Sequence, residues 1–307
     1  MKLLAGAALL VLFCAVAPGQ QNPPPGQPAV SDLAPQYGQN PLVSEGDRLY
    51  LRRQEGRVGL KASAGPINQA IALYDKATAD PHYVEARWKL MRALYFKGVY
   101  TGLDDDARKA VFEKARRIAE DAITILDSSL EDRGIKGMVE AGPEFLAGNL
   151  KQRGDAAPTF YWASTCYGQW ALSVGAVESA RKGVADKIRN WGAAVVGINP
   201  EFEEGGGYRI LGRLNDQAPW IPFVTGWVSR EDAIKYLRQA MAINPRNFAN
   251  RHFLAEALHR GDEKQQAEAV ELEEGIAADS PSPQRLVEDL TFQEGARQNL
   301  AAWKKAA

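Results

Sequence analysis

The chain has 307 residues, of which 45% are hydrophobic and 24% are charged, and its formal net charge at pH 7 is −1. This composition is typical of a globular protein with one large domain or two small ones. A balanced charge, with a sequence pI near 6.4, argues against a nucleic-acid binder, because such a protein needs a basic surface to neutralise phosphates.

The N-terminus has the pattern of an export signal. Lys2 precedes an apolar run of 14 residues at positions 3–16, too short to cross a bilayer and of the right length for the core of a signal peptide. Small residues at Ala17 and Gly19 then suit signal cleavage. Residues 1–19 are therefore predicted to be a signal peptide, and the mature protein to lie in the periplasm or elsewhere outside the cytoplasm.

The two cysteines bear on export and on stability. Acylation of Cys14 would make the chain a lipoprotein, and this is the alternative to cleavage, although Phe13 stands where a lipobox prefers a small residue. Cys166 is the only other cysteine, so the exported chain has no internal disulfide. We interpret Cys166 as a buried, small apolar residue, and we expect stability to come from packing.

Residues 20–44 are predicted to be a disordered linker. They contain six prolines among Gln, Asn and Gly, and they offer little apolar surface to bury. Helical periodicity begins at Glu45 and continues to the C-terminus, so residues 45–307 are predicted to form a single all-α domain. No stretch has the pattern of a convincing β-strand.

The first clear helical hairpin is predicted over residues 65–102. Apolar residues repeat at helical spacing in two segments, which are separated by a turn at Pro81. Gly98 is the predicted end of the second helix. A second hairpin is predicted over residues 229–261, where Ser229 is the N-cap.

A recurring turn signal gives the fold class. The tripeptides at 79–81, 198–200 and 243–245 read ADP, INP and INP, and each one ends a predicted helix. Their spacing is uneven, so the repeats are degenerate. We therefore predict an all-α fold of 11 to 13 helices, in which tetratricopeptide-like helical hairpins stack as an α-solenoid or superhelix.

The glycine-rich stretch EGGGYRILGRL, residues 204–214, resembles the start of a phosphate-binding loop. A true P-loop needs Lys and Ser/Thr where Arg213 and Leu214 stand, and Glu203 and Glu204 would repel phosphate. We predict no nucleotide and no other cofactor. The glycines are interpreted as a tight turn that needs positive φ or close approach of a neighbouring element, and Gly206 is assigned the positive φ.

No pattern in the sequence predicts an enzyme. His252, Glu256 and His259 share one helical face, but the two histidines are not at the spacing of a metal-ligating pair, so we interpret the set as the polar outer face of a helix. The sequence has no G-x-S-x-G, H-E-x-x-H or C-x-x-C motif. We expect a protein without catalytic or metal-binding residues.

Aromatic residues are concentrated in the middle of the chain. Trp162, Cys166 and Trp170 form one stripe at helical spacing, and Tyr161 begins a second stripe. Further aromatics follow, including Trp220. Core packing between helices explains such residues, and so does a groove for an apolar or amphipathic ligand, with one face of the helix in the core and the other lining the pocket.

Five segments in order carry a family resemblance. They are FYWASTCYGQW (160–170), GINPEF (197–202), GGGYRILGRL (205–214), APWIPFVTGW (218–227) and AIKYLRQAMAINP (233–245). This order resembles the TatT family, the helical accessory component of some bacterial tripartite ATP-independent periplasmic (TRAP) transporters. The resemblance is best over residues 157–260, and the first half of the chain matches only as generic tetratricopeptide-like helices.

The resemblance implies function as well as fold. Members of that family have an apolar pore or cleft, associate with the transporter's periplasmic solute-binding protein, and assemble as trimers. Carried over by position, the candidate cleft residues are Tyr161, Trp162, Cys166, Trp170, Gly205, Gly206, Gly207, Tyr208, Arg209 and Trp220. We expect a non-catalytic exported protein that binds a protein partner and an apolar small molecule. The alternative is a general periplasmic scaffold for protein–protein interaction.

Overall fold

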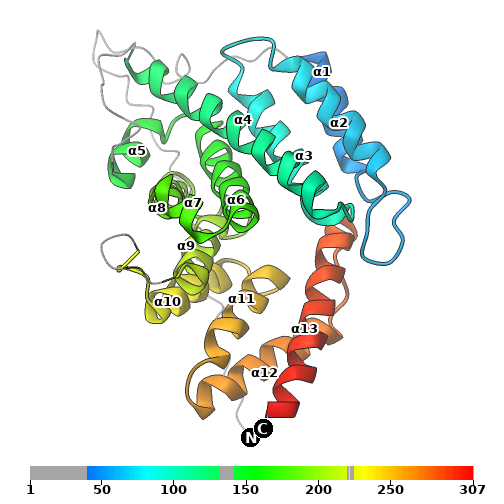
Figure 1. The fold of residues 1–307 in the computed structure, drawn as a ribbon, viewed down its shortest axis with the longest axis vertical. Helices are drawn as coiled ribbons and strands as arrows, with labels where there is room; N and C mark the ends of the chain where they lie inside the picture. Colours follow the sequence, from blue (N-terminus) through cyan, green and yellow to red (C-terminus); the bar gives the residue numbers. More distant parts are fainter. Residues whose placement is uncertain (1–39, 132–141, 220, 222–224, 307) are drawn as a thin grey trace, which may run out of the picture.

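The computed structural model describes residues 40–131, 142–219, 221 and 225–306 (Figure 1). Within these ranges the chain forms 13 α-helices, one short 3₁₀ turn and no β-strand, so the all-α prediction is confirmed. The predicted signal peptide, most of the predicted linker, and Trp220 lie outside the described residues.

The helices follow one another with short connections. Their bounds are α1 (Pro41–Leu51), α2 (Ala64–Ala77), α3 (Val84–Tyr100), α4 (Asp105–Glu131), α5 (Pro143–Leu150), α6 (Ala156–Val174), α7 (Ala176–Arg181), α8 (Val184–Ile198), α9 (Gly206–Gln217), α10 (Arg230–Ile243), α11 (Phe248–His259), α12 (Glu263–Ala278) and α13 (Leu286–Ala306).

Two predicted boundaries differ from the structure. Helix α1 begins at Pro41, inside the stretch assigned to the linker, because Asn40 caps it by accepting a hydrogen bond from the Leu42 amide at 2.9 Å. Pro41 occupies the first helical position, where a missing N–H costs nothing. Gly98 does not end α3, which continues to Tyr100. A Cβ at Gly98 would collide with Phe112 of α4, so this glycine serves the close packing of two helices.

Packing follows the order of the chain over most of the molecule. Helices α1 to α4 each pack against the next; α4 packs against α6, α6 against α8, and α8 to α13 continue in sequence. Helix α6 also packs against α3 and α9, and thus lies in the middle of the fold. One large hydrophobic core joins α1–α6, α8 and α9 and includes Val287 of α13, and two smaller clusters lie among α10–α13.

The segment that follows α1 also contacts the start of α13. The Arg53 Nη2 atom donates to Glu288 Oε1 at 2.8 Å and to the Gln284 carbonyl at 2.7 Å. Gln54 bonds the same segment from both sides, since its amide donates to the Pro283 carbonyl and its oxygen accepts from the Val287 amide. Figure 1 shows the start of α13 beside the loop that follows α1.

Candidate functional site

The glycine-rich stretch is the turn that leads from α8 into α9. Glu203, Glu204 and Gly205 have positive φ values of 49°, 58° and 84°, and α9 begins at Gly206. Gly206 itself has no positive φ, so the assignment of positive φ to this glycine was wrong, and the alternative, close approach of a neighbouring element, applies. A Cβ at Gly206 would lie 2.5 Å from Cε2 of Tyr161, which means that the residue is small because α9 lies directly on the α6 ring.

Arg209 fixes this turn to two other helices. Its buried guanidinium donates to the Tyr161 hydroxyl at 3.0 Å, to Asn250 Oδ1 of α11 at 2.7 Å, and to the Glu203 carbonyl at 3.1 Å. Asn250 also donates to the Glu204 carbonyl at 3.0 Å. The strained turn is therefore held by hydrogen bonds that join α6, α9 and α11.

Tyr161 and Trp162 belong to a continuous row of aromatic rings, which we call the aromatic row. The row runs from α1 through α3 and α6 to the turn before α9, and neighbouring ring centroids are 4.9–6.4 Å apart. Its members, in spatial order, are Tyr50, Phe96, Tyr100, Tyr95, Trp162, Tyr161 and Phe202. These separations are those of favourable tilted and edge-to-face aromatic pairs.

Polar atoms along the aromatic row are only partly paired. Arg53 lies over the ring of Tyr50, 4.7 Å from its centroid, and Arg209 bonds Tyr161 at the other end. Among the described residues, Trp162 Nε1 and Glu288 Oε2 are buried without a hydrogen-bond partner. Buried polar atoms usually have one, so these two atoms need an explanation.

The row contains tyrosines whose pKa values are raised. Burial is the main cause for Tyr50, Tyr95, Tyr100 and Tyr161, because the charged phenolate loses its hydration. The nearby Arg209 guanidinium opposes this effect at Tyr161 without reversing it. These hydroxyls thus stay protonated and can donate hydrogen bonds at neutral pH.

The remaining predicted residues of α6 lie elsewhere. Cys166 is fully buried, with its sulfur 3.6 Å from the Met91 carbonyl, and burial raises the pKa of its thiol. This confirms the interpretation as a small core residue. Trp170 donates from Nε1 to Glu113 of α4 at 2.7 Å. Tyr208, on α9, is half-buried.

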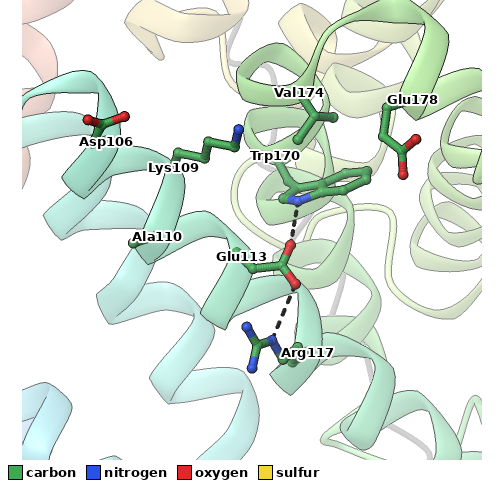
Figure 2. Close-up of a pocket in the computed structure, with 8 residues that line it drawn as sticks. All are labelled: Asp106, Lys109, Ala110, Glu113, Arg117, Trp170, Val174 and Glu178. Carbon is green, nitrogen blue, oxygen red and sulfur yellow. Dashed lines mark hydrogen bonds and ion pairs between the residues drawn. The ribbon is translucent and has the colours of Figure 1, made fainter.

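Trp170 lines a surface groove that the sequence did not predict. This feature, called the α4–α6 groove, has a volume of about 510 Å³, and Figure 2 shows its lining residues. They are Asp106, Lys109, Ala110, Glu113, Arg117, Trp170, Val174 and Glu178. Trp170 is the only predicted cleft residue among them.

Glu113 is the best-connected carboxylate of the α4–α6 groove. It accepts hydrogen bonds from Arg116, Arg117 and Trp170. The bond from Arg116 contributes most to lowering the pKa of Glu113 to about 2, and the indole of Trp170 adds to the effect. The groove therefore keeps this negative charge throughout the physiological pH range.

The histidine set on α11 does not lie on an outer face of the fold, so that interpretation was wrong: His252 is buried, and Glu256 and His259 are half-buried. His252 contacts Glu273 of α12 at 3.1 Å through Nδ1, whereas His259 stacks on Trp303 of α13 with ring centroids 3.9 Å apart. Across the described ranges, no group of three or more His, Cys, Asp or Glu side chains is arranged to hold a metal ion. The helices of those same ranges include none that is long and apolar enough to span a membrane.

The structure thus divides the ten predicted cleft residues. Tyr161, Gly206 and Arg209 meet directly, with Trp162 beside them, while Cys166 and Trp170 face α3 and α4. Sequence reasoning missed the tyrosines of α1 and α3, which come close to α6 only through tertiary packing. Compared with protein-family models and with curated proteins, the chain matches none.

Proposed function

We propose that this protein is a non-catalytic, exported binding protein with a solenoid of tetratricopeptide-like hairpins, which holds an apolar ligand against the aromatic row. The sequential packing of α1–α4 and α8–α13 supports the solenoid. The resemblance to TRAP accessory components supports export and a solute-binding protein as the partner.

One observation carries the ligand proposal. Tyr95, in the centre of the aromatic row, keeps accessible surface although surrounding protein excludes enough water to raise its pKa. Tyr50 combines the same two properties. Tyr50 and Tyr95 are half-buried, whereas Phe96, Tyr100 and Trp162 beside them in the row are buried. We therefore infer that these two rings line a recess between α1, α3 and α6.

The chemistry of the aromatic row favours a mainly apolar ligand with a small polar group. The rings supply apolar surface, and the unpaired Trp162 Nε1 supplies a hydrogen-bond donor. Because a buried donor without an acceptor is unfavourable, a ligand oxygen that accepts from this indole would gain affinity.

An apolar fluorophore tests the recess. N-phenyl-1-naphthylamine should bind the protein with an increase in fluorescence. Tyr95→Trp enlarges a side chain inside the recess and should weaken binding about tenfold. The matched control is Tyr236→Trp on α10, which makes the same change at another half-buried tyrosine and should leave binding unchanged. Equal binding by both variants would contradict the recess.

The partner requires a separate test. Crosslinking in the intact cell, followed by purification of this chain, should recover a solute-binding protein of a TRAP-type transporter. Recovery of another envelope protein at the same face would favour the alternative, a general periplasmic scaffold. Fluorophore binding does not depend on this result, so the ligand and partner proposals can fail independently.

A further inference from the structure

The face of α4 that lines the α4–α6 groove carries four charges of alternating sign. They are Asp106, Lys109, Glu113 and Arg117, and their spacing of three, four and four residues places them on one side of the helix. Figure 2 shows these four side chains in a row along α4. We call them the charge row.

The charge row is complementary to itself in one orientation. If two copies of α4 lie antiparallel about a two-fold axis at the level of Val111, Asp106 lies opposite Arg117, and Lys109 lies opposite Glu113. Both pairs are then attractive. A parallel arrangement in register would instead place each charge opposite itself. Two-fold interfaces require this kind of self-complementary surface.

Three of the four charges of the row are exposed and available for such pairing. Within the described ranges, Asp106 and Lys109 form no ion pair with any other residue. Arg117 has a side chain that is 71% exposed, and its only ion pair is a 3.2 Å contact with Glu113. Glu113 stays ionised because Arg116 and Trp170 hold its carboxylate.

Apolar surface lies beside the charge row. Ala110 is exposed within it, and half-buried Val174 of α6 lies on the opposite wall of the groove, where Trp170 is only 4% exposed. Helix α7 continues that wall with no buried residue, and Val177 is 86% exposed. Glu178 of α7 also lines the groove, where it forms an ion pair with Arg181 at 2.8 Å. Apolar contact surrounded by complementary charge is typical of protein interfaces.

We propose that the charge row binds the same row of a second copy of this chain, forming an antiparallel two-fold dimer. Asp106 pairs with Arg117 of the second copy, and Lys109 pairs with Glu113. This dimer goes beyond the proposed ligand and transporter partner, and it differs from the trimer that the family resemblance implies. The aromatic row remains free in it, because none of its members lines the α4–α6 groove.

Charge exchange tests the dimer by analytical ultracentrifugation of the purified protein at low salt, over about 1–200 µM. The wild type should sediment as a monomer–dimer equilibrium. Asp106→Arg and Arg117→Asp each place like charges opposite one another, so each should weaken the dimer at least about tenfold. The double variant Asp106→Arg/Arg117→Asp restores opposite charges and should dimerise like the wild type.

Mixing the two single variants gives a sharper result. One variant has arginine at both positions and the other has aspartate at both, so an equimolar mixture should form a heterodimer although neither variant dimerises alone. Arg238→Asp is the matched control, since it makes the same charge change at an exposed ion pair with Glu268 and should not alter association.

Several outcomes would overturn the dimer. A wild type that is monomeric or trimeric over this range contradicts it, as does a dimer that the single changes do not weaken, or a mixture that forms no heterodimer. Melting curves of each variant identify a loss of fold. Since the mixing experiment requires both single variants to regain association, an unfolded variant cannot imitate the expected result.

Discussion

The α1–α9 region and the α10–α13 region both bury apolar and polar side chains, but polar ones make up a larger share of the buried residues in the second. The first has one large core in which aromatic and aliphatic side chains are fully buried, among them Tyr74, Phe96 and Phe112. The second, yellow to red in Figure 1, has two small apolar clusters. Its buried polar residues are Asn247, Asn250, Arg251, His252, Glu273, Asp289 and Gln293.

The contrast shows that two adjoining sets of helices can combine apolar and polar burial in different proportions. Apolar packing tolerates small changes of shape but loses free energy in proportion to the volume removed. Buried polar contacts contribute little net free energy when complete, but they are costly when one partner is lost. The two regions should therefore respond differently to substitution.

The largest effect is expected from Phe112→Ala in the first region. Phe112 is fully buried and fits against Gly98 of α3. Loss of the ring leaves a cavity that a glycine cannot fill, so the free energy of unfolding should fall by about 3–5 kcal/mol. Urea denaturation measures this change. A cost below about 1 kcal/mol would show that the α3–α4 contact collapses easily.

Glu273→Gln is the corresponding test of the second region. The Glu273 carboxylate is fully buried and contacts His252 and Asn299. Replacing the charge by an amide should lower the free energy of unfolding by about 2 kcal/mol. The double variant His252→Leu/Glu273→Leu should cost less than the sum of the single changes, because it removes both polar partners. Additive costs would mean that the two side chains do not interact.

Tyr161→Phe tests the junction between the two regions. The substitution removes the hydroxyl that Arg209 contacts at 3.0 Å and leaves the ring in place under Gly206. Because this hydrogen bond involves a charged group, its loss should lower the free energy of unfolding by about 1.5 kcal/mol. Tyr208→Phe, on a half-buried residue of α9, is the control and should be nearly neutral. Hydrogen exchange of residues 203–209 should increase only in the first variant.

The smallest effect is expected at Glu113, on the surface of the first region. Its pKa is lowered to about 2 from the ordinary value of a glutamate, near 4.5. The stabilisation that its charge provides is therefore present above pH 4.5 and is lost as the pH falls toward 2. Solvent screening reduces this contribution to about 1 kcal/mol. The free energies of unfolding of the wild type and Glu113→Gln should therefore differ at pH 6 and converge near pH 2. A difference that stays constant with pH would exclude the ionised carboxylate as its cause.

Much of the fold could be predicted from local pattern. Apolar repeats and turn signals identified the helices, because helical periodicity is a property of neighbouring residues. The errors have local causes as well. Pro41 was assigned to a linker although Asn40 caps it into α1, and Gly98 was taken as a helix end although it accommodates Phe112.

The candidate site was less predictable because tertiary packing assembles it. Tyr161, Trp162 and Arg209 were identified from sequence, but Tyr95 comes from α3, and only its contact with Trp162 relates the two. Likewise, His252 was grouped with residues of its own helix, whereas its closest acidic partner is Glu273 of α12. Residues on one helix face can be predicted, but the helix opposite that face cannot.

The contact between Arg53 and Glu288 has a consequence for biosynthesis. These residues are 235 positions apart, so Arg53 cannot obtain this contact until α13 has been synthesised. Contacts of such long sequence separation form late because the chain must first close a large loop. In a chain without α13, Arg53 would lack the Glu288 carboxylate that accepts its hydrogen bond. The segment that follows α1 thus depends on a helix that the ribosome synthesises much later.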